Sequence, residues 1–532
     1  MTETTDAVRA ALDPDHCAAF EARVGAEAAA LQRAIREGAF DASHFAVGLE
    51  LEGYVVDGAG RLATAPERLF DTDGCSRELG VHNAELHTDP DVVSGAGLRR
   101  QFEELRATHR NVRAALEDDG LDFVLDAMWT REPEMGSLEY LEVGEETDGV
   151  FLSTHMRTVP RYIALDQEIR RRNGGVIEMD LPGLSETSSM LVESLATSMQ
   201  PHLQVPDPDD IPAYLNVATR TMGPILSLTA NSPFLPADRY ESDLGSDVLD
   251  RTPHELRVPI FERSVEEGSS KCRLPRDVDS IDAVIDRMAD DPTLVAVPDL
   301  IDEHTEAAVR SVKDSEDVEN DADEAADGDD ADEFSAFAAK RGTYWRWVRP
   351  VFGGDIPRDP DGEHLAAADR NSVRLEYRPL PTQPTLRDTV GVQALVVGVL
   401  RGVDVADHPL AELPWEDARA SFYAAVDDGP DADLHWVTAD GDATTTTADI
   451  YDELFSLARR GLTAFGVDAA SIDWALDPIE ARRQARFPSP SAWKRARARD
   501  ARREGASLPD AIREMQAAYV DRAADGVPFA EW

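Results

Sequence analysis

The chain has 532 residues, of which 104 are Asp or Glu and 53 are Lys or Arg, so its formal net charge is −51. A field of that sign repels nucleic acid and anionic membrane surfaces, which excludes both as expected partners. The three cysteines, Cys17, Cys75 and Cys272, lie far apart in the sequence and argue against a disulfide framework or a zinc site.

The N-terminal residues and the charge balance indicate the cellular setting. Residues 1–13 are acidic and lack an apolar core, so we expect no signal peptide there. No apolar run approaches the roughly 18 residues that a membrane span needs. We therefore expect a cytoplasmic protein. The acidic excess fits a halophilic source, where salt would screen the self-repulsion over a few ångströms.

The first 40 residues are predicted to form an N-terminal helical segment. Asp13 followed by proline is a helix start signal, and Phe20, Val24, Leu31 and Ile35 follow at a rough helical spacing.

The next segment, residues 47–56, alternates like a β-strand. Val47 and Leu49 are among its apolar positions, and Glu50 and Glu52 point to the opposite face. Two carboxylates at this spacing lie about 6.6 Å apart and repel each other unless a positive charge is nearby. Such oxygen ligands suit Mg²⁺ or Mn²⁺. On this segment alone, the solvated face of an amphipathic strand is an equally good interpretation.

Three later segments, residues 82–87, 199–205 and 373–380, show the same alternation of apolar and polar side chains. Pro201 cannot donate to a strand ladder, so it indicates a sheet edge or a bulge. The polar positions of the three segments are Asn83, Glu85, His87, Gln200, His202, Gln204, Arg374, Glu376 and Arg378.

Helices are predicted between and after these strands from apolar spacing and start signals. Two of them cover about 97–116 and 211–228. Residues 155–162 introduce another that ends near 172, and residues 384–388 open a strongly apolar one that ends near 400. Helices dominate 411–466.

Two regions stand apart from this pattern. Residues 314–333 contain no Lys or Arg and many acidic residues, a composition that predicts a solvated, disordered insertion. Residues 480–532 are predicted to be an Arg-rich helical extension that lies against an acidic surface of its own chain or of a neighbouring subunit. A homo-oligomer is therefore open.

Strands with polar groups on one face predict an α+β fold, in which an antiparallel sheet has helices on one face and an open cleft on the other. Carboxylates with one imidazole suit hard divalent cations, and arginines beside them suit phosphate and carboxylate substrates. This mixture favours phosphoryl transfer to small molecules. Because the chain has no P-loop, a nucleotide would be held by metals and arginines. The cleft would gather Glu50, Glu52, Glu85, His202, Arg374, Glu376 and Arg378.

The same residues carry a resemblance to a known family. Residues 48–57 resemble the opening strand of the glutamate–cysteine ligase (type 2) family, and residues 226–234 resemble its L-x-A-N-S-P-F/W segment. Residues 347–350 and 373–378 are similar to its W-x-x-R-P and T-x-E-x-R elements. The resemblance makes residues 41–479, with the insertion, a glutamate–cysteine ligase-like catalytic domain. It implies a glutamine-synthetase-like fold.

The activity that this resemblance implies is ATP-dependent joining of a carboxylate to an amine through an acyl phosphate. The carboxylate would be the γ-carboxyl of glutamate and the amine cysteine, as in γ-glutamylcysteine or glutathione biosynthesis. Glu52 and Glu85 would hold one Mg²⁺, and Glu50, His202 and Glu376 a second that bridges the phosphates.

Three arginines complete the implied site. Arg349 and Arg378 would bind ATP and stabilise the transferring phosphoryl group, and Arg161 would bind a substrate carboxylate. One departure from the family pattern is His202-Leu203-Gln204, where the family often has H-x-H or Q-x-N. That departure leaves the amine substrate open.

Two other functions stay open. One is a guanidino phosphotransferase built on the same kind of sheet. The other is a catalytically silent relative that binds nucleotide or amino acid as a regulator. The presence of Glu50, Glu52, Glu85, Glu376 and Arg378 speaks against the silent relative.

Overall fold

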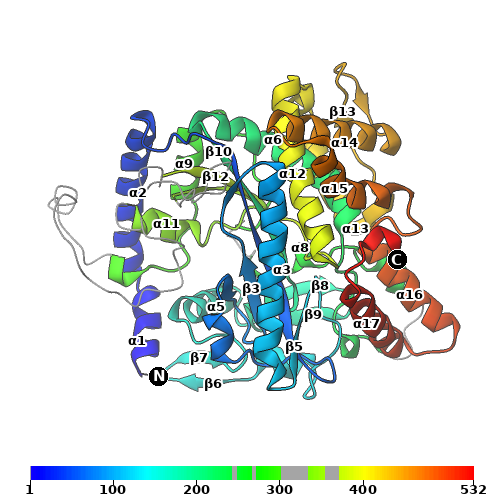
Figure 1. Ribbon diagram of the computed structural model, residues 1–532. Coiled ribbons are helices and arrows are strands. Elements are labelled where there is room, and N and C mark those ends of the chain that lie inside the picture. Colours follow the sequence, from blue (N-terminus) through cyan, green and yellow to red (C-terminus); the bar gives the residue numbers. More distant parts are fainter. Residues whose placement is uncertain (1, 242–247, 266–270, 301–333, 354–370) are drawn as a thin grey trace.

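The computed structural model describes residues 2–241, 248–265, 271–300, 334–353 and 371–532. The insertion predicted at 314–333 lies outside these residues. In the part of the chain that is described, helices surround a central sheet (Figure 1), which confirms the predicted α+β class.

The central sheet has eight strands, and every pairing in it is antiparallel. Its main path is β11-β12-β10-β1-β3-β2, and β4 and β5 also pair with β1, which makes the long strand β1 the centre of the sheet. The strands are β1 (Ala46–Asp57), β2 (Cys75–Arg77), β3 (Asn83–His87), β4 (Asp91–Val92), β5 (Leu121–Val124), β10 (Met199–Val205), β11 (Val348–Phe352) and β12 (Val373–Tyr377).

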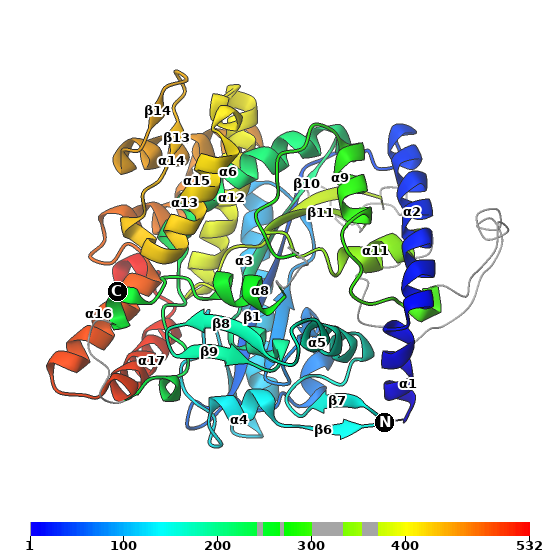
Figure 2. The same ribbon diagram turned by 180° about the vertical axis from the view of Figure 1, so that it is seen from behind.

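Three two-stranded hairpins and a series of helices surround this sheet (Figures 1 and 2). The hairpins are β6 (Gly144–Thr147) with β7 (Val150–Ser153), β8 (Ile177–Leu181) with β9 (Leu184–Thr187), and β13 (Trp436–Val437) with β14 (Ala443–Thr444). The α-helices are α1 (Thr2–Ala11), α2 (Pro14–Arg36), α3 (Gly95–Glu117), α4 (Ser137–Glu142), α5 (Pro160–Arg172), α6 (Ile211–Thr229), α7 (Val248–Arg251), α8 (Arg257–Ser264), α9 (Ile281–Ala289), α11 (Ser335–Arg341), α12 (Leu386–Ala406), α13 (Trp415–Asp428), α14 (Thr447–Ala464), α15 (Ala469–Glu480), α16 (Pro490–Arg503) and α17 (Leu508–Ala524).

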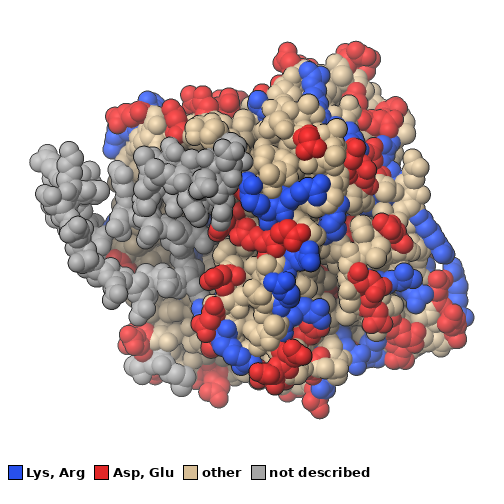
Figure 3. Space-filling model, in the orientation of Figure 1, with Lys and Arg blue, Asp and Glu red and all other residues tan. Residues whose placement is uncertain are grey.

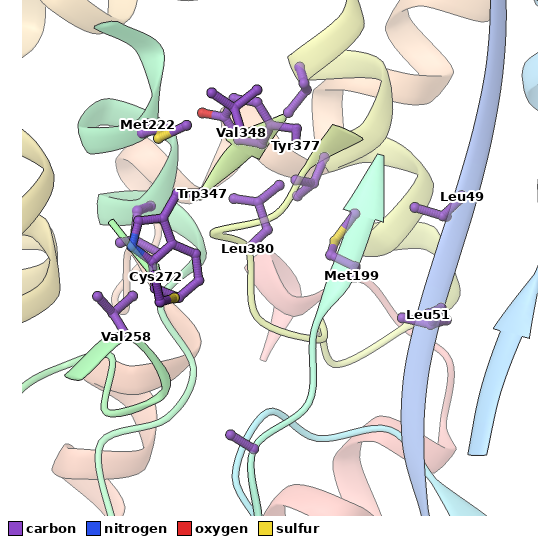
Figure 4. Packing of buried hydrophobic residues seen from close by; sticks show 14 of the residues in the cluster. Leu49, Leu51, Met199, Met222, Val258, Cys272, Trp347, Val348, Tyr377 and Leu380 are labelled. Carbon is purple, nitrogen blue, oxygen red and sulfur yellow. The ribbon is translucent and has the colours of Figure 1, made fainter. Parts of the chain in front are cut away.

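One face of the sheet is apolar and buried. Helices α3, α6 and α12 contact its strands, and Figure 4 shows Met222 of α6 beside Val348 and Tyr377. The alternation read from the sequence explains this, because the odd-numbered positions of β1 and β10 share that face. Leu51, Leu86, Met199, Leu203 and Leu375 are at most 1% exposed.

Helix α12 runs through the core beside this face. Among the described residues it is the one helix long and apolar enough to cross a membrane, and most of it is buried inside the protein. It begins at a Thr385 cap, whose hydroxyl accepts from the N–H of Asp388, and extends to Ala406, past the predicted end near Leu400.

The expectation that Pro201 marks a sheet edge or bulge is wrong, since β10 lies between β1 and β12 with an unbroken register. Leu49, which faces Pro201, directs its N–H to Thr88 Oγ1 and its C=O to the N–H of Thr88. Pairing with β12 begins only at His202. The missing N–H of Pro201 therefore interrupts no ladder bond.

Candidate active site

The register of the sheet brings the predicted polar residues onto its second face. Glu52 lies opposite Glu85 of β3, and Glu50 lies opposite Gln200 of β10. His202 of β10 lies opposite Glu376 of β12. Residues directly opposite each other in an antiparallel pair point to the same side, so these carboxylates, the imidazole and the amide share one surface.

Three carboxylates on this face form a compact group, which we call the carboxylate triad: Glu52, Glu78 and Glu85. One ligand oxygen from each lies within 4.8 Å of the others. Burial, reinforced by the charge of Glu52, raises the pKa of Glu78 to about 8. The pKa of Glu52 is also raised, chiefly by burial. Like charges held this closely are the arrangement that a divalent cation relieves.

Glu78 was missed in the sequence. It follows β2 and lies in the connection to β3, outside any alternating segment, so the period of two gave no signal for it. Its place in the triad depends on how the β2–β3 turn folds back over Glu52, which is a tertiary feature.

The carboxylate of Glu52 has a fixed orientation. Oε2 accepts from the N–H of Ser198 at 2.7 Å, and Oε1 accepts from Ser198 Oγ at 2.8 Å and from Gln200 Nε2 at 3.2 Å. The N–H of Glu52 donates to Ser198 O at 2.9 Å. Ser198 thus determines both the backbone and the side-chain geometry of this residue.

Glu376 lies between two arginines in the neighbouring part of the face. Arg349 donates to it through Nε at 2.7 Å and Nη2 at 3.0 Å, and Arg378 donates through Nη1. Burial alone would raise the pKa of Glu376, but the two guanidiniums hold it well below its usual range. Burial and the nearby Arg378 lower the pKa of Arg349 to about 10.

Gln200 joins these two groups. Its Oε1 accepts from Arg378 Nη1 at 2.6 Å, while its Nε2 donates to Glu52. A continuous set of hydrogen bonds therefore runs from the carboxylate triad to the Arg349–Glu376–Arg378 cluster. Both groups belong to one polar surface.

His202 and Glu50 lie between them. His202 Nε2 is 3.1 Å from Glu50 Oε1, and Arg374 Nε donates to His202 Nδ1 at 3.1 Å. Burial opposes ionisation of Glu50, but His202 outweighs it and lowers the pKa of Glu50.

These contacts test how well each predicted ligand set fits a metal ion. The triad presents only carboxylate oxygens, the donors that Mg²⁺ prefers, and it is the only such group of three within 4.8 Å among the described residues. Glu50, His202 and Glu376 are brought close together, but each is paired with a protein group. The first predicted set, Glu52 with Glu85, therefore fits directly, and Glu78 completes it.

The predicted carboxylate-binding Arg161 lies at the start of α5 and not on the sheet. Its Nη2 donates to Ala339 O at 2.8 Å, and its pKa is lowered by burial and by the charge of Arg349. It therefore lies on the Arg349 side of the face.

Arg257 was also missed. It begins α8, is 1% exposed, and donates from Nη1 to Arg378 O at 2.9 Å. Its guanidinium is the cation that acts most strongly on Glu52. A single arginine at a helix start has no periodic pattern around it, so no feature of the sequence selects it.

The comparison with known families identifies the class. A family model for glutamate–cysteine ligase family 2 (GCS2) matches residues 46–482. The protein is therefore an ATP-dependent carboxylate–amine ligase. Within that class, the chain belongs to glutamate–cysteine ligase family 2, which confirms the resemblance read from its motifs.

Solved structures show more distant likenesses. A glutamate–cysteine ligase from Francisella tularensis in complex with AMP is 15% identical with a TM-score of 0.44, covering 92% of this chain and 93% of that chain. A bifunctional glutathione synthetase from Pasteurella multocida is 14% identical with a TM-score of 0.49, covering 90% and 53%. The ligase PafA in complex with the ubiquitin-like protein Pup is 12% identical with a TM-score of 0.34, covering 88% and 71%. No curated protein matches the chain. At these scores the structures carry no argument about substrate.

Proposed function

We propose that this ligase activates the γ-carboxyl group of glutamate with Mg-ATP and joins it to an amine, with cysteine as the first candidate. The observation that carries the proposal is the hydrogen-bonded continuity between the carboxylate triad and the Arg349–Glu376–Arg378 cluster through Gln200. A divalent-cation site and a phosphate-binding site on one surface are what phosphoryl transfer from ATP requires.

The proposed reaction has two steps. A γ-carboxylate oxygen of glutamate attacks the γ-phosphorus of ATP, ADP leaves, and an acyl phosphate forms. The amine nitrogen then attacks the acyl carbon, inorganic phosphate leaves, and one proton is released as the amide forms. Arg349 and Arg378 would stabilise the phosphoryl charge in the first step.

The carboxylates have the complementary task of holding the divalent cation. The triad supplies Glu52, Glu78 and Glu85, while Glu50, His202 and Glu376 form the set proposed for a second ion. The Mg²⁺ or Mn²⁺ held there would neutralise phosphate charge. Glu376 would have to exchange part of its contact with Arg349 and Arg378 for such a ligand role.

Binding of the anionic substrate needs a further positive group. Arg161 is the candidate, because its half-buried guanidinium lies near Arg349 and donates to Ala339 O at 2.8 Å. A cationic guanidino acceptor would need carboxylates that are not committed elsewhere. On the described face, the carboxylates already lie against one another, against arginines or against His202. This arrangement favours the ligase over a guanidino phosphotransferase.

The test is to incubate the protein with Mg-ATP and glutamate in molar KCl and to add hydroxylamine, which traps acyl phosphates as hydroxamates. We expect γ-glutamyl hydroxamate and phosphate in equal amounts, and amide formation when cysteine replaces hydroxylamine. A stable N-phosphorylated product without hydroxamate would instead support the phosphotransferase. Absence of both, with nucleotide bound, would support the silent regulatory relative.

A further inference from the structure

The chain continues beyond the family match at residue 482. Residues 483–532, which we call the C-terminal arm, contain α16, α17 and a final turn at Phe529–Glu531. Helices α16 and α17 lie side by side in both views (Figures 1 and 2) and pack against each other.

Buried polar contacts attach the arm to the catalytic part. Lys494 Nζ pairs with the carboxylate of Asp126 and donates to Asn231 O at 2.8 Å. Gln516 Nε2 donates to the other oxygen of Asp126 at 2.8 Å. Lys494, Asp126 and Asn231 are all 0% exposed. Contacts of this kind cost several kcal/mol when one partner is removed, so the arm is firmly attached.

From this attachment a relay of hydrogen bonds reaches Glu52. Asn231 Nδ2 donates to Tyr519 Oη of the arm at 2.9 Å and to Thr382 O at 2.8 Å. Thr382 Oγ1 lies 2.9 Å from Glu52 O and 2.9 Å from Ser198 O, and its hydroxyl donates to these carbonyl oxygens. Ser198 then donates to the Glu52 carboxylate through its N–H and its hydroxyl.

Every member of this relay outside the site is buried. Tyr519, Asn231 and Thr382 are 0% exposed, so no water can replace a lost partner without rearrangement. Thr382 holds β1 and the start of β10 at the point where Glu52 and Ser198 meet. A shift there would move the Glu52 oxygens relative to Glu78 and Glu85.

We propose that the C-terminal arm positions Glu52 within the carboxylate triad, and that Tyr519 and Thr382 are positioning residues for divalent-cation binding at that triad. This inference rests on one part of the proposed function, namely that the triad binds the divalent cation. It assigns a role in the site to a segment that lies outside the family match.

The first test measures Mn²⁺ binding directly by electron paramagnetic resonance of the free ion, in molar KCl to suppress binding to the acidic surface. The Glu78→Gln variant identifies the binding that belongs to the triad. We expect Tyr519→Phe, which removes one hydroxyl, to weaken triad binding three- to tenfold. Tyr451→Phe is the matched control, because Tyr451 is also buried and its hydroxyl donates to Pro224 O at 3.1 Å. It should change binding less than twofold.

The second test separates positioning from general destabilisation. Thr382→Val removes the hydroxyl and should weaken Mn²⁺ binding at least as much as Tyr519→Phe, whereas Thr382→Ser keeps the hydroxyl and should restore it. Folded Tyr519→Phe and Thr382→Val proteins with unchanged triad affinity would overturn the proposal, as would a wild-type protein without Glu78-dependent binding. Because the readout is binding of Mn²⁺ alone, a failure of the hydroxamate assay leaves this result interpretable.

Discussion

Among single residues, Glu52 belongs to the triad and is also held by Ser198 and Gln200, so its substitution is the sharpest test of the triad. Glu52→Gln keeps the shape but removes one charge of the three. We expect ATP turnover to fall at least about a hundredfold, on the order of 2.7 kcal/mol of transition-state stabilisation. The assay is phosphate release with glutamate and amine present, and the exposed Glu103→Gln on α3 is the control. Near-normal turnover with unchanged Mg²⁺ dependence would remove Glu52 from the site.

A second residue, Glu193, is a buried carboxyl group near Arg257, and its raised pKa predicts a pH dependence of the free energy of unfolding. Burial raises its pKa to about 8, against an opposing hydrogen bond from Ser264. Between its unfolded pKa and about 8 the folded protein binds a proton that the unfolded chain does not. The stability from this group is therefore complete below the unfolded pKa and is lost as pH rises through 8.

Glu193→Gln should remove that dependence. Relative to wild type, the variant should gain stability as pH rises from about 5.5 to 8.5, measured by urea denaturation midpoints at several pH values. The exposed Glu186→Gln on β9 is the control and should follow wild type. A constant difference between Glu193→Gln and wild type across this range would contradict the assignment.

At the level of elements, the crossing of α12 and α14 depends on glycines. A Cβ built on Gly402 would lie 1.9 Å from Leu457 O, and one on Gly461 would lie 1.9 Å from Gly398 O. The two helices can approach this closely only because these positions have no side chain. Backbone atoms cannot move aside as a flexible side chain could.

Gly402→Ala should therefore destabilise the protein by about 1–3 kcal/mol or more, although alanine is the better helix former. Gly25→Ala in α2, where a Cβ would meet nothing within 4 Å, should instead stabilise by about 0.5–1 kcal/mol. Thermal and urea unfolding of the pair check both signs. Stabilisation by both substitutions would show that α12 and α14 can separate at little cost.

The elements also show where sequence reasoning succeeds. The alternation in β1, β3, β10 and β12 predicted which face of each strand is polar, because side-chain direction in a strand depends only on local period. The prediction from local sequence was wrong at Pro201. Whether the missing N–H of a proline disrupts a sheet depends on whether the neighbouring strand would accept a hydrogen bond at that position, and the sequence of the strand does not show this.

For the whole molecule, charge is the dominant feature. The face in Figure 3 carries acidic and basic side chains side by side, and surface pairs such as Arg113–Asp122 and Arg106–Glu103 occur. With 104 acidic and 53 basic side chains, one-to-one pairing leaves 51 acidic groups without a Lys or Arg. Their mutual repulsion opposes the compact state.

We therefore expect stability to rise with ionic strength. Going from about 0.1 M to above 1 M KCl shortens the screening length from about 10 Å to about 3 Å, and the melting temperature should rise by several degrees. Sodium chloride at equal ionic strength should act similarly, because screening depends on ion charge. A melting temperature that falls or stays constant with added salt would contradict both this argument and the halophilic source inferred from composition.

The sequence by itself determined the fold class, the family and most of the polar face, since each of these rests on local alternation or on short motifs. Glu50, Glu52, Glu85, His202, Glu376 and Arg378 all lie on strands or directly after one. Only the tertiary structure decided what these groups contact. Three contacts join distant segments: the turn that brings Glu78 to Glu52, the burial of Arg257 beside the site, and the link from the C-terminal arm through Asn231 to Thr382. These contacts depend on how the helices and the sheet pack against each other, which no local sequence pattern specifies.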